Sequence, residues 1–406
     1  MLLPENSNMT RTARTMMKEY PETQIFFGED ALDSLCTELG KKSCRKVLLF
    51  AGGSSERSAV LSRKVLDKLS GKGISGILHD RICPEPAVED VRKMVRSIPE
   101  ETEGLEIIAV GGGSVMDAAK AAWLSYQTGR DVCELFGVNI ASGKEPRRSF
   151  RKVLCVPTTR GTGSEATPYS NIVDPSSGIK KLIVEKEIIP FAAFVDPALT
   201  MSMSQTLTSV TALDALVHCV ESVLNYRASD AHKNAQEWGI EGVRLIVKGL
   251  PMVRKNLTDP EGRTLLSAAA TLGGMCIKNR PTSLPHLCSF SFYGQVSHGE
   301  AVAALLIPFW RYYLGEERVR EETMKLAGIF SPAKESVPEE VVANGARFIG
   351  ENGGVYRLAE LGCPESMIRK TAADAVLNPV KLQSCPRPLK VEEAEQVIGE
   401  ILKKGW

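Results

Sequence analysis

The stretch Ile107-Ile-Ala-Val-Gly-Gly-Gly-Ser-Val-Met-Asp117 decides the fold that we predict for this chain. A short apolar run ends at Val110, three glycines follow, and an amphipathic pattern then continues to Tyr126. Glycines let the backbone turn tightly, and the first N–H groups of the following helix are free to bind an anion such as a diphosphate. The spacing is not G-x-G-x-x-G, so the usual dinucleotide fingerprint does not apply. A purely structural turn is the alternative interpretation.

Similar units flank this stretch on both sides. Three more apolar runs are typical of buried strands, and amphipathic stretches lie between them. The runs are Val47–Phe50, Val153–Val156 and Phe191–Val195, and the amphipathic stretches are Ala59–Leu69, Ala87–Ser97 and Val115–Tyr126. Short apolar runs that alternate with helical segments predict a parallel sheet. We therefore expect an α/β domain with a Rossmann-like sheet over residues 1–198, in which roughly the first 20 residues form a loose, basic tail.

The pattern changes after Pro197, where strand-like runs largely disappear. Long helical patterns take over at Ser209–Leu224, Asp230–Gly249 and Pro260–Met275. We therefore predict an all-helical C-terminal domain over residues 199–406. Clefts between domains are usual places for small-molecule sites, so we expect the functional site there.

Composition excludes several classes of function. The 406 residues include 50 Lys and Arg against 49 Asp and Glu, which gives a net charge of +1, so no strong field favours nucleic acid or an anionic membrane. No run of eighteen apolar residues predicts a membrane span, and the N-terminus does not resemble a secretory signal. Ten cysteines without a C-x-x-C pair are typical of reduced thiols. We expect a cytoplasmic protein.

A second loop of interest is Pro157-Thr-Thr-Arg-Gly-Thr-Gly-Ser-Glu165, which follows the strand predicted at Val153–Val156. Its hydroxyls and glycines supply hydrogen-bond donors without bulk, and an ordinary polar turn is the alternative.

The few histidines suggest a metal site. In Asp214-Ala-Leu-Val-His218 a carboxylate and an imidazole are four residues apart, so they share one face of the predicted helix. His286 and His298 follow downstream. Three imidazoles and one carboxylate suit a divalent transition metal. For any single histidine, a satisfied core or surface position is the simpler interpretation.

Together these segments resemble the iron-containing alcohol dehydrogenase family, also called the group III or metal-dependent alcohol dehydrogenases. The likeness extends over roughly residues 24–380 and rests on the glycine-rich loop up to Lys120, the Thr-rich loop, Phe194-Val-Asp-Pro197, Asp214–His218 and His298-Gly. It implies an N-terminal dinucleotide-binding domain, a helical metal-binding domain and a homodimer. It also implies NAD or NADP and one divalent metal, Fe²⁺ or Zn²⁺, as cofactors for a reaction between a small aldehyde and its alcohol.

The resemblance also assigns roles to residues. It makes Asp214, His218, His286 and His298 the metal ligands at the reaction centre. It places Gly112, Gly113, Ser114 and Asp117 along the diphosphate, Thr158, Thr159 and Thr162 beside the nicotinamide, and Lys181 near its ribose.

Cofactor choice depends on the end of the second strand, Gly52-Gly-Ser-Ser-Glu-Arg57, where Gly52, Gly53 and Ser54 would contact the cofactor. Enzymes that prefer NAD often carry a carboxylate at this tip, and none stands here. Ser54 and Arg57 could accept a 2′-phosphate, which permits NADP without requiring it, while Glu56 opposes it.

The chain departs from the family pattern at three positions. Phe290 stands where the family has a second histidine, which puts proton delivery in doubt, and Arg160 and Arg280 replace small residues. A buried guanidinium needs a partner, which could be the cofactor phosphates, a carboxylate such as Glu165, or an anionic substrate. We therefore predict a short aldehyde that carries a sulfonate, phosphonate or carboxylate, as in the branch that reduces phosphonoacetaldehyde and sulfoacetaldehyde.

The alternatives are a dehydrogenase of a small neutral alcohol or diol, of the butanol or propanediol type, a lyase like dehydroquinate synthase, and a binding scaffold without activity.

Overall fold

The computed structural model describes residues 8–53, 56–144, 148–228, 231–333, 335–355 and 357–406. They form two compact units: Arg14–Ser202, and Met203–Trp406 together with the described residues up to Ala13. Our boundary at residue 198 falls inside the short 3-10 helix η4 (Pro197–Thr200). Leu199 on this helix is buried in the core of the first unit, so that unit continues to Ser202.

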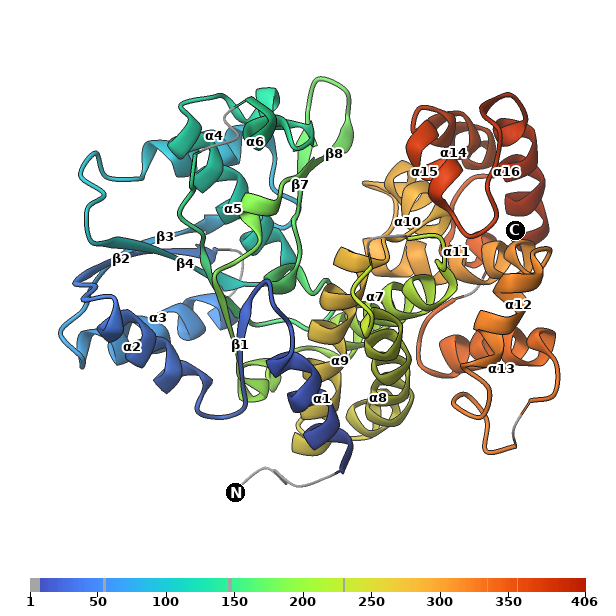
Figure 1. Ribbon diagram of the computed structural model, residues 1–406, viewed down its shortest axis with the longest axis horizontal. Coiled ribbons are helices and arrows are strands. Elements are labelled where there is room, and N and C mark those ends of the chain that lie inside the picture. The colour runs from blue at the N-terminus through green and yellow to red at the C-terminus, as the bar shows by residue number, and fades with distance from the viewer. Residues whose placement is uncertain (1–7, 54–55, 145–147, 229–230, 334, 356) are drawn as a thin grey trace. The chain divides into compact units, whose positions relative to one another are not determined.

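The first unit is built on a six-stranded parallel sheet (Figure 1), which confirms the predicted fold class. The strands, in their order across the sheet, are β1 (Gln24–Phe27), β9 (Ala192–Val195), β6 (Leu154–Pro157), β4 (Leu105–Gly111), β2 (Lys46–Gly52) and β3 (Ser75–Ile82). The four apolar runs of the sequence correspond to β2, β4, β6 and β9. The two edge strands were not predicted, because an edge strand buries fewer of its side chains and β3 is largely polar.

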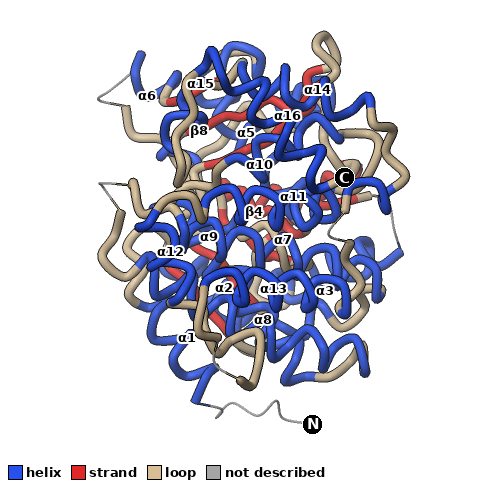
Figure 2. Tube along the Cα trace, turned by 90° about the vertical axis from the view of Figure 1, so that its right-hand side faces the viewer, coloured by secondary structure: helices blue, strands red, loops and turns tan. Residues whose placement is uncertain are grey.

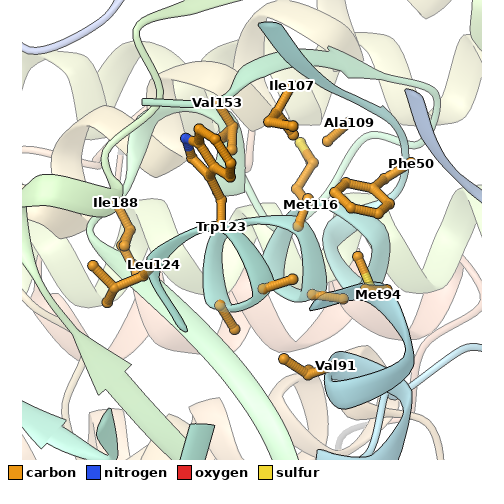
Figure 3. Packing of buried hydrophobic residues seen from close by; sticks show 14 of the residues in the cluster. Phe50, Val91, Met94, Ile107, Ala109, Met116, Trp123, Leu124, Val153 and Ile188 are labelled. Carbon is orange, nitrogen blue, oxygen red and sulfur yellow. The ribbon is translucent and has the colours of Figure 1, made fainter. Parts of the chain in front are cut away.

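Helices cover both faces of this sheet. The side chains of Val47, Leu49 and Ala51 in β2 point to one face, where α2 (Ala31–Lys41) and α3 (Glu56–Ser70) pack. Leu48 and Phe50 point to the other face. There they meet α4 (Val88–Arg96) and α5 (Gly113–Thr128), and Figure 3 shows Phe50 beside Met94 and Met116. Burying a side chain of this size contributes about 1.5–3 kcal/mol, so β2 is held from both sides.

The order of the strands defines where a ligand would bind. The chain runs from β2 outward to β3 and then returns to form β4 on the other side of β2. The connections therefore change direction between β2 and β4, and in open parallel sheets ligands bind at the carboxyl ends of the strands at such a point. Gly52 and Gly53 stand at the end of β2, and Gly111–Gly113 stand at the end of β4.

A smaller sheet and several short helices complete this unit. The order of the sheet is β5 (Gly137–Val138), β8 (Ile179–Val184) and β7 (Tyr169–Asp174), and β7 and β8 are antiparallel. The other short elements are η1 (Val132–Leu135), α6 (Ile140–Lys144), η2 (Ser164–Ala166) and η3 (Lys186–Ile188).

Residues 8–18 form the helix α1 (Asn8–Lys18), so our prediction of a loose basic tail was wrong. Ala13 and Met17 are four residues apart and both buried, because they share one apolar face of this helix.

The second unit is helical, as predicted (Figure 2). Its long helices are α7 (Gln205–Leu224), α8 (Ala235–Lys255), α9 (Pro260–Asn279), α11 (His298–Tyr313), α13 (Pro338–Glu351) and α16 (Val391–Gly405). Its shorter helices are α10 (Leu284–Ser289), η5 (Phe290–Phe292), α12 (Glu317–Met324), η6 (Leu358–Leu361), α14 (Ser366–Val376) and α15 (Pro379–Ser384).

Helix α7 is the core helix of the second unit. It is long and apolar enough to cross a membrane, but 83% of its apolar window is buried inside the protein. The helices α8, α9 and α11 pack against it. Its apolar composition therefore fits a core helix, and any polar side chain on it needs partners inside the protein.

We expect Gly53→Ala to lower the free energy of unfolding by about 1–3 kcal/mol, because an added Cβ would lie 1.9 Å from the carbonyl oxygen of Asp80. Gly40→Ala is the matched control. It places a methyl group in open space on α2 and should stabilise the protein by about 0.5–1 kcal/mol. Urea unfolding measures the stability of both variants. A Gly53→Ala variant as stable as the wild type would contradict the close approach of β2 and β3.

Candidate functional site

Three helical segments bring the predicted metal ligands together. Asp214 and His218 lie one turn apart on α7, which begins at the capping residue Ser204. His286 lies on α10, and His298 is the first residue of α11. The four residues are separated by up to 84 positions in the sequence, so only the packing of the helices brings them to one point.

All four side chains gather around one oxygen atom, Oδ1 of Asp214. Asp214 Oδ1 is 3.7 Å from His218 Nε2, 3.6 Å from His286 Nε2 and 3.7 Å from His298 Nε2. These distances exceed those of hydrogen bonds. Ligand atoms around a tetrahedral zinc ion, each bonded at about 2.1 Å, lie about 3.4 Å from one another. The ligand atoms of Asp214, His286 and His298 all lie within 4.8 Å of one another, which suits a small divalent cation. His218 approaches the same oxygen of Asp214 but is not part of this mutually close group.

Unpaired polar atoms in this cluster support the same interpretation. Among the described residues, Asp214 Oδ1 and His286 Nε2 are buried and have no hydrogen-bond partner. Buried polar atoms are otherwise nearly always paired, so two that point to one centre indicate a missing partner. His298 is 28% exposed, which gives the centre a side that is open to solvent.

Charged neighbours shift the pKa values of Asp214 and His286. Burial alone would raise the pKa of Asp214, but the three imidazoles outweigh burial and hold its pKa below the usual range. Burial opposes protonation of His286, yet the carboxylates of Glu221 and Asp214 raise its pKa to about 9. A cation that binds here competes with the proton of this imidazole.

Two neighbours of the ligands were not predicted. Glu221 is fully buried on α7 and bonds the Nδ1 atom of His286 through its Oε2 atom. Its Oε1 atom accepts bonds from the backbone N–H and the hydroxyl of Ser283, both at 2.7 Å. Ser289 Oγ lies 3.3 Å from His298 Nδ1. A signal for Glu221 was present in the sequence, since the positions 214, 218 and 221 share one helix face.

The glycine-rich and threonine-rich loops meet at the carboxyl end of the large sheet. The N–H group of Thr158 donates to the carbonyl of Gly111 at 2.9 Å. A Cβ on Gly112 would lie 2.7 Å from Thr159 Oγ1, and one on Gly113 would lie 2.5 Å from Thr162 Cγ2. The close contact of the two loops therefore requires these glycines. Because α5 begins at Gly113, its first N–H groups lie where the strand connections change direction.

Other residues that we assigned to the cofactor have partners inside the protein. Asp117 accepts bonds from Ser164 Oγ at 2.6 Å and from the N–H of Asn171 at 2.9 Å. The hydroxyl of Ser114 accepts from the N–H of Glu85 at 3.1 Å. Asp117 therefore holds Ser164, near the end of the threonine-rich loop, and Asn171 on β7 against α5.

The remaining positions that we assigned to the cofactor differ in their surroundings. Lys181 forms an ion pair with Asp174 at 2.7 Å in the small sheet. Gly52 and Gly53 lie at the end of β2, and Ser54 lies outside the described residues. Arg57 donates to Ser202 Oγ at 2.7 Å and to the carbonyl of Thr158, so it braces the threonine-rich loop.

Lys120 on α5 was missed as a positioning residue. It is fully buried and donates to Ser164 Oγ at 2.8 Å and to the carbonyls of Thr167 and Tyr169, each at 3.1 Å. Burial lowers its pKa. Together with Asp117, one turn earlier, it fixes the segment that follows the threonine-rich loop.

Both unusual arginines bind carbonyl groups. Arg160 donates to the carbonyls of Pro157 at 2.7 Å and Asp196 at 2.8 Å, and so joins the ends of β6 and β9. Arg280 donates to the carbonyls of Asn225 at 3.1 Å and Val223 at 3.0 Å at the C-terminal end of α7. A cation is favourable at that end of a helix. Main-chain carbonyls are therefore partners of both guanidinium groups, beside the anionic partners that we had expected.

Phe290 and two thiols border the metal centre. The ring of Phe290 stacks on that of His298, with centroids 6.2 Å apart and planes 12° apart. Cys276 Sγ donates to the carbonyl of Gly273 at 3.1 Å, and burial raises the pKa of Cys288 far above its usual range. Neither thiol is poised to act as a thiolate ligand.

Comparisons with known proteins cover both units of the chain. A family model described as iron-containing alcohol dehydrogenase matches residues 21–197, and one described as the C-terminal part of the Fe-containing alcohol dehydrogenase family matches residues 208–403. Alcohol dehydrogenase 4 of Saccharomyces cerevisiae (strain YJM789) is 26% identical, over 94% of this chain and 96% of its own length. The NADPH-dependent butanol dehydrogenase of Clostridium saccharobutylicum is 32% identical over 67% of each chain. The solved structure of an iron-containing alcohol dehydrogenase from Thermotoga maritima covers 95% of this chain and 99% of its own, with 26% identity and a TM-score of 0.76.

We expect Arg280→Ala to lower the free energy of unfolding by about 1–3 kcal/mol, because two buried carbonyls at the end of α7 lose their partner. Arg369→Ala, at an exposed position on α14, should change it by less than about 0.5 kcal/mol. Urea unfolding is the measurement. A variant at Arg280 that is as stable as the wild type would contradict the capping role.

Proposed function

Because this chain belongs to the iron-containing alcohol dehydrogenase family, we propose that it is an NAD(P)-linked oxidoreductase that interconverts a short neutral alcohol and its aldehyde. One observation carries this proposal. The buried Oδ1 atom of Asp214 has no hydrogen-bond partner among the described residues and stands 3.6–3.7 Å from three imidazole nitrogens.

The residues of the helical unit would hold the cation. Asp214, His218, His286 and His298 supply one negative charge and three neutral nitrogens, a set that suits Fe²⁺ or Zn²⁺. When bound, such a cation supplies Lewis acidity toward the oxygen of the alcohol or aldehyde. The exposed side of His298 gives a small molecule access, and the apolar ring of Phe290 shields the imidazole next to it.

The residues of the α/β unit would hold the dinucleotide, which supplies the hydride chemistry. The free N–H groups at the start of α5 suit a diphosphate, and Gly112 and Gly113 allow close approach. The side chains of Thr158, Thr159 and Thr162 lie in the neighbouring loop and offer hydroxyl donors. Phe290 carries no ionisable group, so we propose that the proton is exchanged through solvent or the cofactor ribose.

A neutral substrate is now better supported than the anionic aldehyde that we first expected. The expectation of an anion rested on Arg160 and Arg280, and both guanidinium groups are occupied by main-chain carbonyls. The relative that is 32% identical acts on butanol by its name. We therefore place the substrate among short alcohols without a charged group.

The cellular setting is part of the same proposal. All ten cysteines lie among the described residues and none forms a disulfide, which supports a reducing compartment such as the cytoplasm. We also propose a homodimer, and analytical ultracentrifugation would test it.

We expect Asp214→Asn and His286→Ala to lose most bound metal and, with it, the dehydrogenase activity. His232→Ala is the matched control, because His232 stacks on Trp238 and takes no part in the cluster. Metal analysis of the purified proteins and NAD(P)H turnover are the measurements. Full metal content together with full activity in His286→Ala would contradict the ligand assignment.

Removing the metal should also destabilise the wild-type protein. At free metal of about 100 times Kd, binding to the folded state adds about 2.7 kcal/mol to stability. We expect a chelator to lower Tm and the return of metal to restore it, with little response in Asp214→Asn. Thermal unfolding with and without the metal measures this, and an equal response in both proteins would place the metal elsewhere.

We expect butanal or propanal to be reduced at a kcat/KM at least about tenfold above that of sulfoacetaldehyde, because Arg160 and Arg280 already bind main-chain carbonyls and would not repay the desolvation of a sulfonate. The assay is run on metal-loaded enzyme with NADH and with NADPH, so it also shows which dinucleotide the enzyme prefers. A higher kcat/KM for sulfoacetaldehyde would support an anionic substrate instead. If the enzyme reduced neither kind of aldehyde, the proposed function would be contradicted.

A further inference from the structure

Glu221 lies where a charged side chain is costly, fully buried in the last turn of the core helix α7. Its side chain is fully buried, and its Oε1 atom is occupied by two donors from Ser283, both at 2.7 Å. Only its Oε2 atom is left for another partner, and this atom meets Nδ1 of His286. A carboxylate that is held from both oxygens has little freedom to turn away from the imidazole.

The direction of these bonds fixes where the protons are. The hydroxyl of Tyr313 lies 3.1 Å from Ser283 Oγ, and it accepts from the N–H of Leu284, so its own proton is directed to Ser283. The hydroxyl of Ser283 in turn donates to Glu221. An ionised carboxylate only accepts, so Nδ1 of His286 must carry the hydrogen between them. Its Nε2 atom, 3.6 Å from Oδ1 of Asp214, is then the nitrogen that is left to bind a cation.

His298 has a weaker version of this arrangement. Ser289 donates its proton to the carbonyl of His286 at 2.7 Å, so its oxygen is left to accept from Nδ1 of His298 at 3.3 Å. A neutral hydroxyl at this distance orients the ring but adds no charge. The two imidazoles therefore have the same tautomer, and only that of His286 is polarised by a carboxylate.

The two buried carboxylates of the site also support a bound cation. Asp214 and Glu221 are both buried and carry two negative charges, which match a divalent cation bound among neutral imidazoles. A buried charge without compensation is costly, so the pair is best satisfied with such an ion in place.

We propose that Glu221 is a positioning residue of the metal centre, which fixes the tautomer of His286 and balances the charge of the cation, and thereby sets how tightly the cation is held. This inference rests on the proposed function, since it requires that Asp214 and the three histidines bind a metal. Partners of this kind typically contribute a factor of 10–100 to metal affinity.

The test compares Co²⁺ binding by the full-length wild type and by Glu221→Gln, using competition with a chromophoric chelator for Kd and the visible absorption of the bound Co²⁺ for its geometry. We expect Kd to rise by about 10–100-fold and the absorption bands to shift. Glu322→Gln is the control, because Glu322 is equally buried but is paired with Arg318 and Lys325, away from the ligands. It should leave Kd and the spectrum unchanged.

A second variant keeps the inference testable if Glu221→Gln does not fold. Ser283→Ala removes one donor to Glu221 and retains the carboxylate, so we expect a smaller rise in Kd, of a few-fold to about tenfold. A wild type that binds Co²⁺ with the same Kd and spectrum as the variants would overturn the role of Glu221 alone. A wild type that binds no Co²⁺ would overturn the proposed function, and this inference with it.

Discussion

The buried carboxylate of Asp214 is the constraint on which the helical unit depends. An ionised group inside an apolar core is tolerated only with charged or polar partners around it, and here three imidazoles from α7, α10 and α11 surround one oxygen. Each imidazole must therefore be brought in by its own helix. Arg280 satisfies the end of α7, Ser283 holds Glu221, and the capping box of Ser297 and Glu300 starts α11 at His298.

The α/β unit depends on a different constraint. Main-chain donors must stay free at one edge of its sheet. Gly112 and Gly113, at the junction of β4 and α5, let the threonine-rich loop approach to within contact distance. The segment after that loop is then fixed by charged groups on α5, since Asp117 and Lys120 reach it from one face.

The sequence predicted those parts whose signals are local. Apolar runs predicted the central strands, and the spacing of four residues between Asp214 and His218 predicted that they share one face of a helix. The edge strand β3 carries no such run, because half-exposed strands accept polar residues, and the run in β1 is only Ile25–Phe27. Glu221 was missed because one acidic residue among apolar neighbours does not reveal its partner. Arg160 and Arg280 were assigned to an anion because sequence alone does not show that a carbonyl lies within reach.

The segment from Arg280 to Ser289 has a further property. Arg280, Ser283, His286 and Ser289 follow one another at intervals of three residues, and each makes a different contact with α7, with Glu221 or with an imidazole. An inserted or deleted residue anywhere in this decapeptide would move at least one of these four side chains away from its partner. Length variation between homologues should therefore accumulate in the exposed turn around Gly294 and Gln295, while the decapeptide itself changes only by replacement of side chains.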